Sequence, residues 1–274
     1  MLECQVCPHH CRLTEGQIGV CRTRINKGDE ITSLNYGKLV SVALDPIEKK
    51  PLAHFHPGSM ILSVGSFGCN FHCPFCQNFQ ISQVGADDIT TKDVTPFELA
   101  QLALDTRERG NIGVAFTYNE PLISYEYIID TAKIVRAQGQ KTVAVTNGCV
   151  TRYTAEQVLP YLDALNIDLK SFNPEFYKKI GGNLSTVKEF IVSATTTSHV
   201  ELTTLIIPGE NDSEEEIEHL SQWIATVNPE IPLHISRFFP RYKMVNKEAT
   251  SVRKVYALAE IARRHLKYVY TGNC

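Results

Sequence analysis

At residues 69–76 the sequence reads Cys69-Asn-Phe-His-Cys73-Pro-Phe-Cys76, a C-x3-C-x2-C pattern with an aromatic residue just before the last cysteine. Thiolates at this spacing can hold three irons of a cubane iron–sulfur cluster, which leaves the fourth iron without a nearby protein ligand. A structural zinc site is the main alternative. Zinc takes four ligands, however, and His72 between two of the cysteines is awkwardly placed to complete a tetrahedron. The stretch therefore favours an iron–sulfur cluster with one open iron.

An open iron of this kind suggests a specific chemistry. It can chelate the amino and carboxylate groups of S-adenosylmethionine, and an electron from the cluster can then break a carbon–sulfur bond to release an adenosyl radical. Two other functions stay open. One is an iron–sulfur electron-transfer or cluster-carrying module without radical chemistry. The other is a zinc barrel hydrolase, for which only His234 is well placed as a ligand.

Composition limits the partners and the compartment. The chain has 274 residues, of which 43% are hydrophobic, and a net charge of −3. This size suits one barrel-sized domain, and the charge gives no reason to expect nucleic acid. No apolar run approaches the length of about 18 residues that a membrane span needs. The nine cysteines, without an apolar signal core at the N-terminus, indicate metal ligation and reduced thiols in the cytoplasm.

The chain after its first fifty or so residues alternates β-rich runs with helical patterns, which is typical of βαβ units around a parallel sheet. Six such units are too few for a closed eight-stranded barrel. We therefore predict an α/β fold, a partial (β/α)6 barrel, with the active site at the carboxyl ends of the strands. The predicted strands are Met60–Ser66, Gly113–Thr117, Thr142–Thr146, Ala164–Asp168, Glu201–Ile207 and Leu233–Ser236. The predicted helices are Pro96–Arg109, Ser124–Gln138, Thr154–Leu162, Ser213–Val227 and Lys247–His265.

Residues 1–59 differ from the barrel segment, residues 60–274. This small N-terminal extension carries a C-x2-C-x3-C-x9-C pattern formed by Cys4, Cys7, Cys11 and Cys21. Four thiolates suffice for a closed zinc site or for an auxiliary iron–sulfur cluster. A segment of this size is too small to bury a core of its own, so we expect it to pack on the barrel or to depend on a metal.

Polar groups follow several of the predicted strands at the point where each strand ends. Each has an ordinary structural reading as well, because a turn, a helix cap, a local ion pair or a buried histidine would use the same residues. As functional groups, a carboxylate at Glu120 can accept from an ammonium, and alternation along a strand puts Asp168 and Lys170 on one face. The hydroxyl and amide groups of Thr146 and Asn147 suit ribose oxygens.

In chain order these motifs resemble radical SAM enzymes of the pyruvate formate-lyase activating type. A Tyr118-Asn-Glu-Pro turn stands where those enzymes have Gly-Gly-Glu-Pro, and Val145 stands where they carry an acid before Thr-Asn-Gly. Asp45-Pro-Ile-Glu-Lys-Lys-Pro-Leu52, Cys7-Pro-His9 and Tyr268-Val-Tyr-Thr-Gly-Asn273 resemble one branch more closely, the AmmeMemoRadiSam system radical SAM enzymes. Members of that branch often continue into a cysteine-bearing tail, whereas this chain stops at Cys274.

The resemblance implies a [4Fe-4S] cluster on Cys69, Cys73 and Cys76, and S-adenosylmethionine bound against it. It implies an activating-enzyme-like oxidoreductase whose 5′-deoxyadenosyl radical abstracts hydrogen from an unidentified substrate, with a partner protein as one option. An electron donor such as flavodoxin or ferredoxin would reduce the cluster. Glu120 would lie near the methionyl ammonium, Lys170 and His234 near its carboxylate or ribose, and Asn147 near the ribose. The implied cofactor-binding residues are Phe75, Tyr118, Asn119, Glu120, Thr146, Asn147, Asp168, Lys170 and His234.

Overall fold

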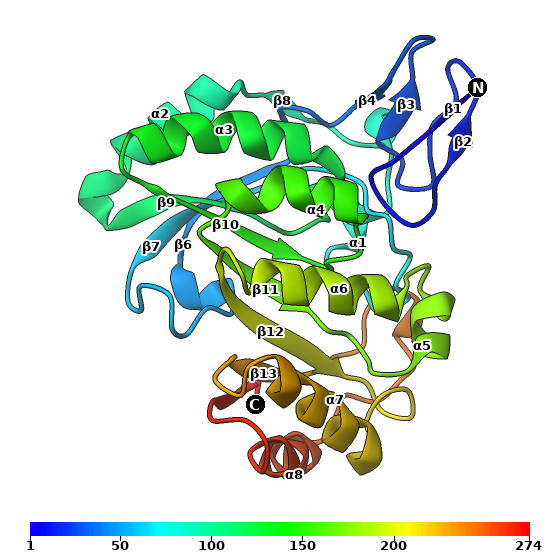
Figure 1. The fold of residues 1–274 in the computed structure, drawn as a ribbon, viewed down its shortest axis with the longest axis vertical. Helices are drawn as coiled ribbons and strands as arrows, with labels where there is room; N and C mark the ends of the chain where they lie inside the picture. The colour runs from blue at the N-terminus through cyan, green and yellow to red at the C-terminus, as the bar shows by residue number, and fades with distance from the viewer.

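A computed structural model describes the whole chain, residues 1–274, as an open and mostly parallel sheet covered on its outer face by helices (Figure 1). The strand order is β14-β13-β12-β11-β10-β9-β7-β6, and only β6 runs antiparallel to its neighbour. The strands are β6 (Ser41–Pro46), β7 (Met60–Gly65), β9 (Asn111–Phe116), β10 (Lys141–Thr146), β11 (Ala164–Asp168), β12 (His199–Ile206), β13 (Leu233–Arg237) and β14 (Val269–Gly272). The edge strands β6 and β14 do not pair with each other, so the barrel is partial.

Helices connect successive parallel strands, and short polar side chains define where several of them begin. Thr95 and Glu98 form a reciprocal capping box at the start of α2 (Pro96–Asp105), and Ser213 caps α7 (Glu214–Val227) by accepting from the backbone of Glu216. The helices are α1 (Phe79–Ser82), α2 (Pro96–Asp105), α3 (Tyr125–Ala137), α4 (Arg152–Val158), α5 (Pro174–Lys179), α6 (Leu184–Ala194), α7 (Glu214–Val227) and α8 (Val252–Ala262).

The predicted α/β partial barrel is confirmed, and each of the six predicted strands lies in the sheet. Two further strands, β6 and β14, extend it. The last helix begins at Val252 and not at Lys247, because a short 3-10 turn and a loop precede it. The helix α6 was not predicted, although its buried residues recur at helical spacing.

The two faces of the sheet bury different residues. Leu62, Val64 and Ala144 belong to the large core beneath the helices, whereas Ile61 and Val143 belong to a small cluster of six residues. Because successive side chains of a strand point to opposite faces, the small cluster lies on the inner face. Residues 47–57, which we call the floor segment, follow β6 and contribute Ile47 and Leu52 to that cluster. The floor segment therefore covers part of the barrel's inside.

The N-terminal extension forms two small hairpins beside the sheet (Figure 1). The short strands outside the main sheet are β1 (Leu2–Glu3), β2 (Arg12–Leu13), β3 (Arg24–Asn26), β4 (Ile31–Ser33), β5 (Lys38–Leu39) and β8 (Lys92–Asp93). Arg24, almost buried, forms an ion pair with Glu126 of α3 at 2.7 Å. The carbonyl of Val6 accepts hydrogen bonds from the backbone amide of Thr151, the N-cap of α4, and from the side chain of Thr154 within α4. The division at residue 60 stays a prediction, but β6, which precedes it, is part of the main sheet.

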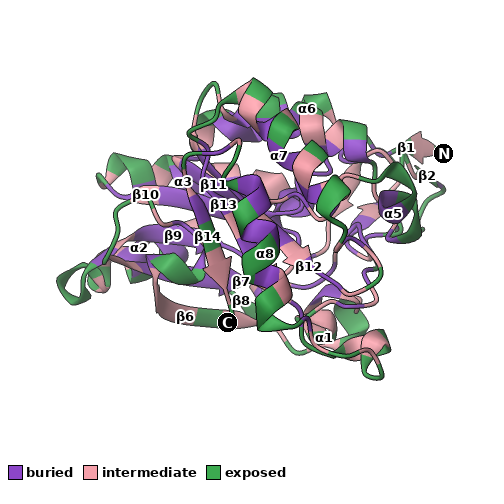
Figure 2. Ribbon diagram, turned by 90° about the horizontal axis from the view of Figure 1, so that it is seen from below, coloured by how far each residue is buried: buried purple, intermediate pink, exposed green.

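Burial follows the layers of the fold. In Figure 2 the central strands and the inner sides of the helices are buried, the edge strand β6 is only partly covered, and most exposed residues lie on the outer helix faces and in loops. Parallel strands covered on both faces are expected to be largely apolar, and β7 and β9 are mostly apolar and buried along nearly all of their length. None of the helices combines the length and the apolar character that crossing a bilayer would require.

Candidate active site

The cysteine loop, residues 68–78, joins β7 to α1 and is held in place at several points along its backbone. Gly68 has φ +81°, and a Cβ there would lie 2.6 Å from the carbonyl oxygen of Cys21, so only glycine fits. The Gly68 amide donates to the carbonyl of Ile81 at 2.9 Å. The His72 amide donates to the carbonyl of Ile180 at 3.0 Å. The N-terminal extension, α1 and the segment after α5 therefore fix the loop together.

Two of the three thiols of this loop, those of Cys69 and Cys73, are held in an environment that disfavours their free thiolates. Burial raises the pKa of Cys69 well above its usual range, and the charge of Glu120 adds to the effect. Burial raises the pKa of Cys73 to about 12, although the ammonium of Lys170 acts in the opposite direction. The Cys76 sulfur lies 3.1 Å from a serine hydroxyl of α1. Buried thiols of this kind become thiolates when a metal cation binds them.

An iron–sulfur cluster fits this arrangement better than a single metal ion does. No group of three or more histidine, cysteine or carboxylate side chains in the structure is gathered closely enough to chelate one ion. A cubane cluster does not need such a group, because each of its cysteines binds a different iron. Cys69, Cys73 and Cys76 would hold three of the irons.

Glu120, at the end of the turn that follows β9, is buried and almost saturated with hydrogen bonds. Its Oε1 accepts from the Leu122 amide at 3.0 Å and from the Thr146 hydroxyl at 2.6 Å, and its Oε2 accepts from the Asn147 amide at 2.7 Å. A carboxylate has about four acceptor positions, so one remains on Oε2. Burial raises the pKa of Glu120 to about 7, against the effect of these hydrogen bonds. A cationic ligand would complete its shell.

The turn before Glu120 ties the end of β9 to both ends of the cysteine loop. Asn119 accepts from the Ser66 amide at 3.1 Å and donates to the carbonyls of Phe67 and Gly68, each at 3.1 Å. The Tyr118 carbonyl accepts from the Asn78 side-chain amide at 2.8 Å. Tyr118 itself has φ +74°, the left-handed region that bulky residues rarely adopt.

Asn147, after β10, faces the cysteine loop. Its amide nitrogen donates to Asn70 Oδ1 at 2.8 Å and lies 3.8 Å from Cys69 Sγ, and its carbonyl oxygen accepts from the Cys149 amide at 2.8 Å. The side chain is therefore engaged within the protein, and the ribose contact expected of it stays a prediction. Cys149 is buried in the large core, as a small apolar residue would be.

Asp168 and Lys170, at the end of β11, form the ion pair that strand alternation predicts, with Nζ 2.8 Å from Oδ2. Burial alone would lower the pKa of Lys170, but Asp168, together with Cys73 when that thiol is ionised, more than offsets it and raises the pKa. The Lys170 carbonyl accepts from the Asn211 side chain at 2.7 Å, which links this strand end to the loop after β12. A cation is thus held beside the cysteine loop.

No hydrogen bond or ion pair joins His234 to these residues, although the sheet register places it level with Asp168 across β12. It is the second residue of β13, its Nε2 lies 2.6 Å from Glu201 Oε2, and its ring stacks on Tyr270. The other oxygen of Glu201, Oε1, lies 2.9 Å from His199 Nε2, and the carboxylate also accepts hydrogen bonds from two backbone amides of the floor segment. His234 is thus a partly buried, hydrogen-bonded histidine, and the cofactor contact expected of it stays a prediction. Phe75 is likewise enclosed by the protein and packs near Phe176.

A segment that the sequence reasoning missed also reaches the cysteine loop. After β13, the Lys243 amide donates to the Pro74 carbonyl at 2.9 Å, and the ring of Tyr242 stacks on Phe79 with centroids 4.6 Å apart. Its position after β13 could have predicted this contact, because the loops that follow the strands of a barrel meet at the same edge of the sheet.

The four N-terminal cysteines lie in one neighbourhood. Burial raises the pKa of Cys7 to about 12, and negative charge on Cys21, Cys4 and Cys11 would raise it further. The Cys4 amide donates to the Cys11 carbonyl at 2.9 Å. His9, which follows in the same segment, has its Nε2 2.9 Å from the Asn70 carbonyl of the cysteine loop. The extension and the cysteine loop are therefore in direct contact.

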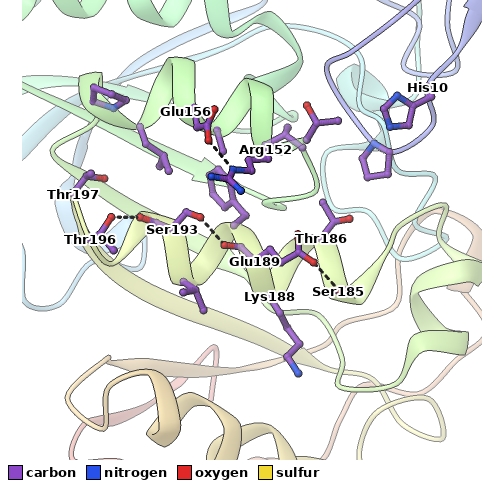
Figure 3. A pocket seen from close by; sticks show the side chains of 18 of the residues that line it. His10, Arg152, Glu156, Ser185, Thr186, Lys188, Glu189, Ser193, Thr196 and Thr197 are labelled. Carbon is purple, nitrogen blue, oxygen red and sulfur yellow. Dashed lines mark hydrogen bonds and ion pairs between the residues drawn. The ribbon is translucent and has the colours of Figure 1, made fainter.

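A wide groove of the molecule lies elsewhere. It has a volume of about 870 Å³ and runs between α4 and α6, where Arg152, Glu156 and Glu189 line it (Figure 3). None of the cofactor-binding residues predicted from the sequence contributes to it.

The fold and this site define a class of protein, an α/β partial barrel with a three-cysteine loop at the carboxyl edge of its sheet. The model of the radical SAM superfamily matches residues 63–223. The chain belongs to this superfamily, whose members are enzymes. Membership implies a [4Fe-4S] cluster and S-adenosylmethionine as cofactors.

Individual relatives agree with this assignment. An uncharacterized protein of Methanocaldococcus jannaschii is 39% identical over 99% of this chain and 81% of its own length. The pyruvate formate-lyase-activating enzyme of Clostridium pasteurianum is 27% identical over 58% of this chain and 67% of its own. The crystal structure of a radical SAM methyltransferase from Sphaerobacter thermophilus matches with a TM-score of 0.59 at 16% identity, covering 79% of this chain and 67% of the other. At that identity the structural match supports the fold alone.

Proposed function

We propose that Cys69, Cys73 and Cys76 hold a [4Fe-4S] cluster and that the chain uses it to cleave S-adenosylmethionine reductively and to abstract hydrogen from a substrate. When bound, the cluster supplies the electron and the open iron for this chemistry. The observation that carries the proposal is the meeting of three thiols, the buried Glu120 and the Lys170 ammonium at one edge of the sheet.

Within this proposal the protein's own charges recognise the amino-acid part of the cofactor. The acceptor position left on Glu120 Oε2 takes the ammonium group, because an opposite charge favours the ionised carboxylate. Lys170, which Asp168 keeps charged, faces the carboxylate group. Neutralising both ends of an amino acid in a desolvated site requires a paired arrangement of this kind.

We further propose that the substrate is a partner protein and that the chain is an activating-enzyme-like oxidoreductase of the AmmeMemoRadiSam branch. Support comes from the ordered motifs and from the name of the Clostridium relative. A reduced flavodoxin or ferredoxin would supply the electron. A chain with nine free cysteines suits a reducing compartment such as the cytoplasm.

We also propose a second metal site on Cys4, Cys7, Cys11 and Cys21, holding zinc or an auxiliary iron–sulfur cluster. Its support is the shared neighbourhood of the four thiols within residues 1–33, where the strands are only two or three residues long. Zinc would have to draw these thiols together, because they are not gathered around one point in this structure. A bound metal would contribute directly to folding that segment.

Anaerobic reconstitution tests the main proposal. The protein is loaded with iron and sulfide, its iron, sulfide and zinc are measured, and 5′-deoxyadenosine is assayed with a strong reductant. A variant with Cys69, Cys73 and Cys76 all replaced by alanine should be folded by circular dichroism and form no 5′-deoxyadenosine. Continued cleavage by that variant would refute the assignment. A wild-type protein that carries the full cluster but cleaves no cofactor would favour an electron-transfer or cluster-carrying module.

A further inference from the structure

Tyr118 is held in a backbone conformation that its side chain disfavours. Its φ of +74° lies in the left-handed region, where an aromatic residue stores strain and where glycine would fit freely. A strained residue at a functional site persists only when its surroundings determine it. Contacts of the Tyr118 side chain must therefore offset the strain.

The Tyr118 side chain extends into the barrel, where it makes three contacts. Its ring lies against Gly65, where an added Cβ would be 2.8 Å from Tyr118 Cδ2. Its hydroxyl donates to Asp45 Oδ2 at 2.7 Å. The same carboxylate oxygen accepts from the ammonium of Lys50 at 3.0 Å, and that ammonium stands 4.7 Å from the centre of the Tyr118 ring.

The ion pair that receives Tyr118 is fixed by the fold. Lys50 is 1% exposed and belongs to the floor segment, and Asp45 lies on the edge strand β6. A buried lysine has to keep a charged partner, so the Asp45 carboxylate cannot swing away without leaving a bare ammonium inside the protein. Tyr118 is thereby anchored to a rigid group.

The backbone of the same residue lies at the centre of the cofactor site. Its carbonyl binds Asn78 behind the last cysteine, Asn119 binds the residues before the first, and Glu120 follows directly. A rotation of the Tyr118 backbone toward an unstrained conformation would displace both neighbours. Anchoring the Tyr118 side chain therefore also fixes the position of Glu120.

We propose that Tyr118 is a positioning residue for S-adenosylmethionine, and that its hydrogen bond to the Asp45–Lys50 pair keeps the Asn119–Glu120 turn where it can receive the cofactor. The inference rests on the proposed function, because it assigns Glu120 to the cofactor. It adds a role for β6 and the floor segment, which lie outside the cysteine loop and the strand ends.

The test compares Tyr118→Phe, Tyr118→Gly and Asp45→Asn in protein reconstituted with its cluster. Tyr118→Phe keeps the strain and loses the anchor, so its dissociation constant for S-adenosylmethionine should rise about tenfold, the size expected for losing a hydrogen bond to a charged group. Asp45→Asn should behave similarly. Tyr118→Gly loses the anchor and the strain together, so it should bind more tightly than Tyr118→Phe.

Two readouts separate positioning from general damage. Binding is followed by the change that S-adenosylmethionine causes in the electron paramagnetic resonance spectrum of the reduced cluster, and iron content is measured for each variant. Tyr36→Phe is the matched control, because Tyr36 donates to Asp130 at 2.8 Å on the surface, and it should bind as the wild type does. Wild-type affinity in Tyr118→Phe would overturn the inference. So would weaker binding in Tyr118→Gly than in Tyr118→Phe, because only the phenylalanine keeps the ring, and that order would mean that the ring itself contacts the cofactor. A wild-type spectrum that does not respond to S-adenosylmethionine would instead refute the proposed function.

Discussion

Replacing Glu120 by glutamine should change how the stability of the protein depends on pH. The folded protein raises the pKa of this carboxyl from 4.5 to about 7. A group whose folded-state pKa is raised contributes stability that is fully present below its unfolded-state pKa and is lost as the pH rises through the folded-state value. The difference between the two pKa values, about 2.5, corresponds to about 3 kcal/mol.

The expected result follows from that window. Between pH 4.5 and about pH 8.5, the free energy of unfolding of the wild type should fall by about 3 kcal/mol relative to that of Glu120→Gln. The glutamine cannot accept from all three donors, and it will cost some stability of its own. That cost is the same at every pH. Any change with pH in the difference between the two unfolding free energies therefore comes from ionisation of the Glu120 carboxyl.

The measurement is urea-induced unfolding of the cofactor-free chain, followed by circular dichroism across this pH range. Glu48→Gln, which removes an exposed carboxylate, controls for the loss of a negative charge. A difference between wild type and Glu120→Gln that stays constant with pH would refute the reasoning. It would mean that Glu120 is ionised in the free protein and that its three hydrogen bonds outweigh its burial.

The remaining predictions concern other parts of the molecule. Changing Cys7 and Cys11 to serine should lower the metal content and expose the N-terminus to limited proteolysis, while the cluster that binds S-adenosylmethionine remains. Fully loaded wild-type protein that contains the iron of only one cluster and no zinc would contradict a second site. Lys170→Ala should weaken S-adenosylmethionine binding, measured by equilibrium dialysis with the cluster intact, because it leaves Asp168 unpaired beside the cofactor carboxylate; unchanged affinity would return the pair to a structural role. Glu201→Ala should destabilise the protein by about 3 kcal/mol in urea unfolding, because it strips partners from two imidazoles and two amides; a loss below about 1 kcal/mol would count against that network.

The sheet could be predicted from the sequence because its strands are buried on both faces and read as short apolar runs. Strand β6 shows where this reasoning stops. In the sequence, residues 31–36 and 38–44 are β-like runs with Gly37 as the turn between them, and Gly37 does have φ +69°. Yet β4 pairs with β3, β5 with β8, and β6 with β7. The local turn signal was correct, and the choice of partner depended on the core, which no local pattern encodes.

The site divides in the same way. The cysteine spacing and the Asp168–Lys170 alternation are local, so the sequence could predict which residues lie close together. His234 was recognised only by its strand, and its actual partner, Glu201, is 33 residues away on the neighbouring strand. A lone histidine carries no information about such a partner.

Tyr118 shows that a single residue can indicate a long-range contact. Its hydroxyl meets a carboxylate 73 residues earlier in the chain, which no periodicity could predict. The substitution itself carried the signal, since a tyrosine stands in a turn where similar enzymes have glycine. A bulky residue at a left-handed position costs energy that glycine would not. A side chain retained there therefore has to make contacts that offset the cost, and the Asp45–Lys50 pair supplies them. Departures from glycine at such turns thus predict that a long-range partner exists, and the structure then identifies which residues it comprises.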